Sequence, residues 1–212
     1  LSYSYLTDKS FFLCDKAINY LTKSFKSQNE DICCAGLRLL GVLTSERQSA
    51  IFLDKSEIFK YLINLLESES ELIQELTYMA IASQSSTFAR TKYLYDCVQI
   101  ATENLSYYPT VFLANISMIP KAGVFIANNI NKFIPLLNDD DNELVRNVLT
   151  IIYRVCHNIE SRKILNNSSV TIILFDQLMD FTDKYYSNAL LKIFENILLV
   201  PNIKTHAKEV NF

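Results

Sequence analysis

The chain has 212 residues, and its 20 basic and 23 acidic residues leave a net charge of −3. Half of the residues are hydrophobic and 20% are charged, which is enough apolar surface to build a folded core and excludes a disordered protein. With only 3 glycines and 4 prolines, the chain has little material for tight hairpins or phosphate-binding loops, and this disfavours all-β and nucleotide-binding folds.

The charge and the apolar segments argue against two classes of partner. The calculated pI is about 5.5, and no long run of Lys and Arg attracts a phosphate backbone, so we expect no nucleic acid. No apolar run approaches the roughly 20 residues that span a bilayer, so we expect no membrane insertion.

The cysteines indicate an intracellular, cytoplasmic protein. They are odd in number, form no C-x-x-C pair and mostly lie among apolar residues, so we expect buried thiols in a reducing compartment. The five are Cys14, Cys33, Cys34, Cys97 and Cys156. Because His157 and His206 are the only histidines, we expect no zinc and no other metal.

Apolar residues recur at steps of three and four along nearly the whole chain, which predicts an all-α fold. Helix breakers and capping residues divide the chain into helices of roughly 10 to 17 residues. In chain order these breaks fall at 68–70, 85–86, 108–109, 120, 139–141 and 166–169. The three aspartates at 139–141 come just before a predicted helix, so we expect them to cap its N-terminus rather than to bind calcium.

The helices form an internal repeat. The segments that begin at Leu72 and Leu144 align without a gap, and each follows a shorter helix and an acidic turn. A degenerate copy begins at Val98, and further copies begin at Ala17 and Thr171. One unit of about 40 residues cannot bury its apolar faces alone, so the repeat predicts an α-solenoid of stacked units.

We expect one domain over residues 1–212. Its approximate repeats are 1–55, 56–95, 96–129, 130–168 and 169–212. Because residue 1 is Leu rather than Met, we expect the chain to be a piece of a larger protein.

These repeats resemble the armadillo family. The segment NIESRKILNNSSVTIILFDQLM, from Asn158, is similar to the turn, short helix and second helix of that family, and Pro135 lies where a second helix often begins. The resemblance implies a right-handed superhelix of about five three-helix repeats. The family's glycine between the first and second helices is missing at 55–56 and 128–129, so HEAT-like helix pairs remain an alternative for some units.

In the family, an Asn on each third helix faces a concave groove and bonds the main chain of an extended peptide. The resemblance places this position at Val42, Ala82, Asn115, Arg154 and Asn196, and the position one turn earlier at Arg38, Tyr78, Val111, Thr150 and Lys192. Arg38, Arg154 and Lys192 make this groove locally basic, which suits an acidic or phosphorylated peptide. In the alternative interpretation, these are solvated side chains of an exposed helix face, and the asparagines bond neighbouring helix ends.

No catalytic pattern accompanies the repeats. The chain has no Gly-rich phosphate loop, G-x-S-x-G elbow or H-E-x-x-H motif, so we expect no cofactor. The side chains of Cys156 and His157 diverge by about 100° on one helix and cannot act as nucleophile and base.

The sequence thus favours a non-catalytic protein-interaction module that holds a partner segment in its groove. The alternative is a structural or regulatory docking domain of a larger protein, such as a kinase or formin, that acts through the solenoid ends or by dimerisation. A helical-repeat enzyme is a third, weaker hypothesis.

Overall fold

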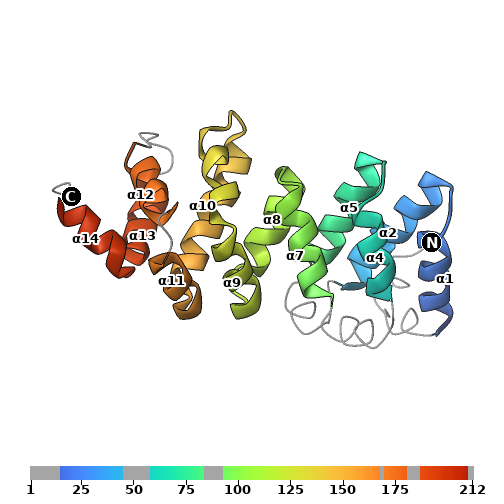
Figure 1. Cartoon of the computed structure of the whole chain (residues 1–212). Coiled ribbons are helices and arrows are strands. Elements are labelled where there is room, and N and C mark those ends of the chain that lie inside the picture. The colour runs from blue at the N-terminus through green and yellow to red at the C-terminus, as the bar shows by residue number, and fades with distance from the viewer. Residues whose placement is uncertain (1–14, 45–57, 84–92, 168–169, 181–186, 210–212) are drawn as a thin grey trace. The chain divides into compact units, whose positions relative to one another are not determined.

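The computed structural model describes residues 15–44, 58–83, 93–167, 170–180 and 187–209, and all the regular structure in these ranges is helical (Figure 1). Cys14, the segment before it, positions 55–56 and the predicted break at 85–86 lie outside the described residues. The described residues divide into two compact units, Leu1–Ile100 and Ala101–Phe212.

The helices of the first unit are α1 (Asp15–Phe25), α2 (Glu30–Thr44), α4 (Ile58–Leu66) and α5 (Glu71–Ala82), and α7 (Leu94–Glu103) begins in this unit. α2 packs against α1 and α5, and α4 packs against α1 and α5. The core between them is apolar, with Leu37, Phe59 and Leu62 almost completely buried.

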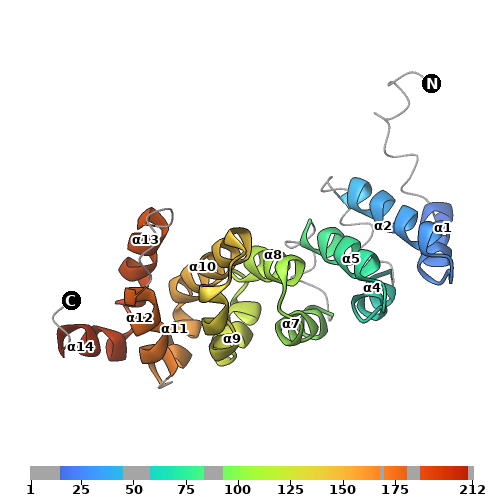
Figure 2. The ribbon, with the colours of Figure 1, turned by 90° about the horizontal axis from the view of Figure 1, so that it is seen from above.

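The helices of the second unit are α8 (Tyr107–Ile116), α9 (Pro120–Asn128), η3 (Ile130–Lys132), η4 (Ile134–Asn138), α10 (Asn142–His157), α11 (Ile159–Asn166), α12 (Val170–Asp180), α13 (Ser187–Ile197) and α14 (Pro201–Glu209). α10 packs against α8 and α13, whereas α11 packs against α9 and α14. Figure 2 shows α8, α10 and α13 on one side of this unit and α9, α11 and α14 on the other.

A middle row fills the space between these two sides. α12 contacts η3, η4 and α14, and the buried rings of Phe112, Phe133 and Phe175 come from α8, the η3–η4 junction and α12. In this unit the chain therefore repeats the order first helix, second helix and third helix. α9, η3–η4 and α10 form one repeat, and α11, α12 and α13 form the next.

The second helix of the first of these repeats departs from the family pattern. Residues 130–138 form two short 3₁₀ segments instead of a helix that begins at Pro135. Pro135 has no N–H to donate, and its ring conflicts with an α-helical carbonyl four residues earlier, so a continuous α-helix from Ile130 onward is interrupted.

The expected cap at the start of α10 is confirmed. The Asp141 carboxylate accepts hydrogen bonds from the backbone N–H groups of Glu143 and Leu144, at 2.9 and 3.3 Å. Asn158 caps α11 in the same way, through the N–H groups of Glu160 and Ser161. Both carboxylate and amide oxygens satisfy donors that have no partner inside the helix.

Candidate functional site

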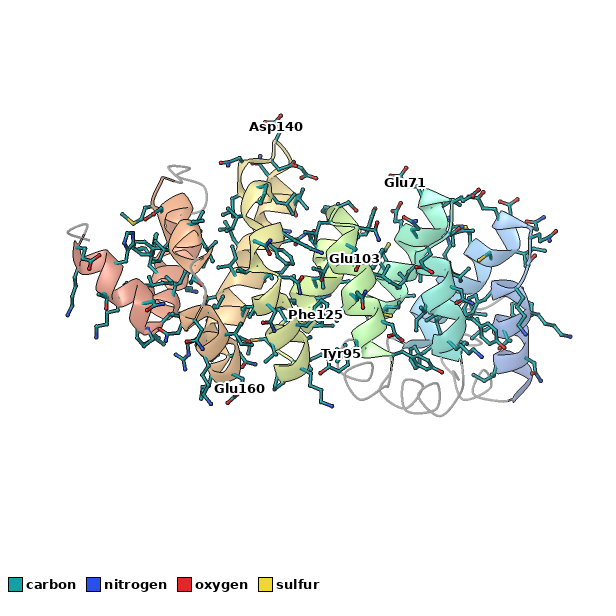
Figure 3. All side chains as sticks on the ribbon, viewed as in Figure 1. Glu71, Tyr95, Glu103, Phe125, Asp140 and Glu160 are labelled. Carbon is teal, nitrogen blue, oxygen red and sulfur yellow. The ribbon has the colours of Figure 1, made fainter. Side chains whose placement is uncertain are left out.

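Six of the residues predicted to bind a partner lie on the third helices of the second unit. We call them the C-terminal face: Val111 and Asn115 on α8, Thr150 and Arg154 on α10, and Lys192 and Asn196 on α13. α10 packs directly against both other helices, so the six residues come from three consecutive neighbours. Asp140 and Glu160 lie beyond the two ends of α10 and mark its length in Figure 3.

Arg154 joins α10 to α8. Its guanidinium donates a hydrogen bond to the backbone carbonyl of Ala114, the residue next to Asn115. The side chain is half-buried and forms no ion pair with a described carboxylate. Arg154 therefore brings a positive charge to the C-terminal face that the neutral carbonyl does not compensate.

Asn196 joins α13 to α10. Its Nδ2 donates to the carbonyl of Lys192 at 2.8 Å, and its Oδ1 lies 3.1 Å from Nδ1 of His157. A carbonyl only accepts, so the amide nitrogen must face Lys192 and the amide oxygen must face His157. Nδ1 of the neutral imidazole then carries the proton, and Nε2 is left as an acceptor on an exposed residue.

His157 was not predicted from the sequence to belong to this face. It lies three residues after Arg154, so the helical period places both on the same side of α10. Its ring stacks on Tyr153, with ring centroids 6.2 Å apart. The helical period was therefore enough to place His157 on this side of α10, whereas the armadillo pattern indicates only Thr150 and Arg154.

Two further polar side chains of α10 are bonded within their own helix. The hydroxyl of Thr150 donates to the carbonyl of Arg146 at 2.8 Å, and the Arg146 guanidinium pairs with Glu143. The positive charge of Arg146 is therefore neutralised locally. Arg154 and Lys192 remain as the two cations of the C-terminal face without a carboxylate partner among the described residues.

Asn115 differs from Asn196 in having a free amide. Its side chain is exposed and makes no hydrogen bond to a described residue, while Val111, one turn earlier, is half-buried. The two asparagines that match the family position thus have different surroundings in the structure. Asn196 is occupied by His157 and Lys192, and Asn115 keeps both its donor and its acceptor for a partner.

In the first unit, the structure places the predicted residues differently on its two third helices. Arg38 and Val42 are exposed on α2, as expected. Tyr78 and Ala82 on α5 are instead core residues, with 3% and 8% of their surface exposed. Burial raises the pKa of the Tyr78 hydroxyl well above its usual range.

The error on α5 is one of register. This helix exposes Leu72 and Met79 and half-exposes Glu75, a stripe that lies three residues earlier than the predicted positions. The sequence prediction placed Tyr78 on the partner-binding face, whereas the structure buries its large aromatic ring.

The cysteines in the described residues are buried free thiols. Burial raises the pKa of Cys156 to about 12 and raises that of Cys97 further. Across the described ranges, no three His, Cys, Asp or Glu side chains gather in a way that holds a metal ion. Nor is any described helix both long enough and apolar enough to cross a membrane.

No family model and no curated protein matches the chain. Among solved structures, one engineered protein has a TM-score of 0.70 at 18% identity, over 84% of this chain and 46% of its own, so this chain spans about half of its length. A second engineered protein has a TM-score of 0.72 at 17% identity, over 85% and 78% of the two chains.

A designed armadillo repeat protein, solved in complex with the peptide (KR)4, has a TM-score of 0.67 at 16% identity, over 84% of this chain and 80% of its own. At these identities the similarity is one of fold. The all-α, armadillo-like repeat fold expected from the sequence is thereby confirmed.

Proposed function

We propose that the chain is a non-catalytic protein-interaction module that binds a peptide segment of a partner across the C-terminal face. The observation that carries the proposal is the pair of hydrogen bonds between third helices, from Arg154 to the Ala114 carbonyl and from His157 to Asn196. These bonds hold α8, α10 and α13 together, so that the Asn115 amide and the cations of Arg154 and Lys192 lie on three adjacent helices.

Each group on this face offers a specific contact to a peptide. The Asn115 amide has one acceptor and two donors, which match the N–H and C=O of an extended main chain. Arg154 and Lys192 suit a carboxylate or a phosphate, and Nε2 of His157 accepts from an N–H group. Affinity then comes from the main chain, and preference for an acidic or phosphorylated segment comes from the two cations.

The fold supports peptide binding by analogy, since a designed armadillo repeat protein of similar fold was solved with a bound peptide. The chemistry of the described residues supports a non-catalytic role. Cys156 is buried and its raised pKa keeps the thiol protonated, so it does not supply a nucleophile. Free buried thiols also suit a reducing compartment, so we place the module inside the cell.

A peptide array that contains acidic, phosphorylated, neutral and basic sequences tests the proposal. We expect acidic or phosphorylated peptides to bind, and we expect Asn115→Ala and Lys192→Glu each to weaken this binding by about tenfold or more. The same changes at the exposed residues Asn128 and Lys121 of α9, on the opposite side of the unit, are the matched controls and should leave binding within about twofold.

Thermal unfolding of all four variants checks that folding is equal. Equal losses in the site variants and the controls would place the interface elsewhere. Binding of no peptide from the array would instead favour docking through the ends of the repeat.

A further inference from the structure

The two third helices of the first unit expose several apolar side chains, whereas the matching turns of α8 and α10 in the second unit present polar ones. We call this surface the N-terminal face: Ile32, Leu39 and Val42 on α2, and Leu72, Leu76 and Met79 on α5. The two helices pack against each other. On α2 and on α5 these residues follow steps of three, four and seven, so they form one stripe on each helix.

The exposure of this face is large for apolar side chains. Val42 is 54% exposed and Met79 is 51% exposed, and Ile32 and Leu72 also count among the exposed residues. In the second unit, the corresponding turns of α8 and α10 carry Asn115 and Arg154. A contiguous patch of exposed apolar residues marks an interaction surface, whereas single exposed apolar residues scattered over a protein are ordinary.

The charges around the N-terminal face are mostly negative. α2 and α5 together carry four carboxylates, on Glu30, Asp31, Glu71 and Glu75, and one guanidinium, on Arg38. Glu30 accepts a hydrogen bond from the Ser70 hydroxyl at 2.7 Å, which joins the starts of the two helices. Glu71 lies at this same end of α5 in Figure 3.

We propose that the N-terminal face binds the apolar side of an amphipathic helix whose flanking residues are basic, supplied by a partner protein. An extended peptide needs side chains that bond its main chain, and Val42 and Met79 have no such groups. A helix satisfies its own backbone hydrogen bonds and needs only apolar contact, with anchors one turn apart.

The composition of the face agrees with this partner. Met79 has a flexible thioether side chain that adapts to the shape of an inserted residue. The carboxylates of Asp31, Glu71 and Glu75 are complementary to Lys or Arg beside the apolar stripe of the helix, and they disfavour an acidic helix.

The test uses a peptide of about 18 residues built from leucine and lysine with the helical period. We expect it to bind the full chain and to become helical on binding, as followed by fluorescence anisotropy and circular dichroism. Met79→Gln should weaken binding by about fivefold or more, because it places an amide against the apolar side of the peptide. Met118→Gln is the matched control, since Met118 is 50% exposed but lies in the second unit, and it should change binding by less than about twofold.

Two further peptides separate the apolar and the charged contributions. Replacing leucine by alanine, or lysine by glutamate, should each abolish binding at the same peptide concentration. If the lysine–alanine helix bound equally well, binding would depend on charge alone and not on apolar contact. If the leucine–glutamate helix bound equally well, the basic residues of the partner would play no part. Either result would overturn the proposal. So would equal effects of Met79→Gln and Met118→Gln.

Sedimentation of the chain without peptide tests whether a second copy of the chain covers the N-terminal face instead. We expect a monomer. Self-association that Met79→Gln dissolves would assign the N-terminal face to a second copy of the chain and contradict a helical partner. Because the residues on α8, α10 and α13 are unchanged in these variants, their result is independent of the peptide-array experiment.

Discussion

Gly36 and Gly41 lie in the same helix, α2, but only Gly36 meets a neighbouring helix. A Cβ built on Gly36 would lie 2.6 Å from Cβ of Ser24 and 3.2 Å from the ring of Phe25, whereas a Cβ on Gly41 meets nothing within 4 Å. Absence of a side chain at Gly36 therefore lets α1 pack closely against α2, and Gly41 has only the entropic cost of glycine in a helix.

Alanine at these two positions should have effects of opposite sign. We expect Gly36→Ala to lower the free energy of unfolding by about 1–3 kcal/mol because the added methyl forces α1 and α2 apart. Gly41→Ala should raise it by about 0.5–1 kcal/mol through helix propensity alone. Urea unfolding followed by circular dichroism measures both, and a gain of stability in both variants would mean that α1 does not pack closely against α2 at Gly36.

At the residue scale, the sequence predicted what depends on local chemistry. The Asp141 cap was predictable because its partners lie two and three residues away in the chain. The burial of Tyr78 was not, because it depends on which neighbours cover α5. The bond between His157 and Asn196 joins residues 39 positions apart, and neither residue type alone indicates it.

At the scale of one element, α10 has a fully apolar side and a polar side. Ile152 is completely buried, whereas Arg154 is half-buried and bonds the Ala114 carbonyl. That carbonyl also accepts from the Ser117 hydroxyl at 2.8 Å, so it keeps a partner if Arg154 is lost. The two residues therefore contribute to stability in different ways.

We expect Ile152→Ala to cost about 2–5 kcal/mol of unfolding free energy, because it opens a cavity in the core. Arg154→Ala should cost less than about 1 kcal/mol, since no buried acceptor is left without a donor. Chemical denaturation of both variants checks the difference. Similar losses would show that the polar side of α10 is packed as tightly as the apolar side, which contradicts the described burial.

The order of helices was predictable because third helices such as α10 combine a long amphipathic period with a capping residue before the first turn. The two 3₁₀ segments at 130–138 were not predicted. A proline can either interrupt an α-helix or occupy its first turn, so the sequence around Pro135 fits both. The packing of η4 against α10 and α12 decides between the two.

At the scale of the whole molecule, both units bury acidic groups that are neutral at pH 7. Burial raises the pKa of Cys97 in the first unit and of Cys156 in the second above the ordinary thiol value of 9.0. Above that value the thiols ionise in the unfolded chain but not in the folded one. Their contribution to stability is therefore complete below about pH 9 and is lost as the pH rises toward 12.

The chain should accordingly be less stable at pH 10 than at pH 8, by about 1.4 kcal/mol for each of these thiols. The double variant Cys97→Ala/Cys156→Ala should lose less stability over the same interval, even though it starts lower. Urea midpoints at the two pH values measure this. An identical pH dependence in wild type and double variant would mean that neither thiol is protected from ionising in the folded state.

The repeat pattern predicted which segments are equivalent, but not that the described chain forms two compact units. Equivalence comes from the period of apolar residues within each helix. Which neighbouring repeats share a core depends on side-chain packing across helices, and a single sequence does not record it.

Among the described residues, the hydrogen bonds that join successive repeats connect residues 30 to 40 positions apart in the chain: 40 for Glu30 with Ser70 and for Ala114 with Arg154, 39 for His157 with Asn196, 36 for Asn166 with Asn202, and 30 for Asp176 with His206. Once one more repeat has left the ribosome, both partners of the next hydrogen bond of this kind are therefore available. Contacts of this short range are formed quickly, because little loop entropy is lost. The chain is therefore suited to assemble from its N-terminus while it is still being synthesised, one repeat after another.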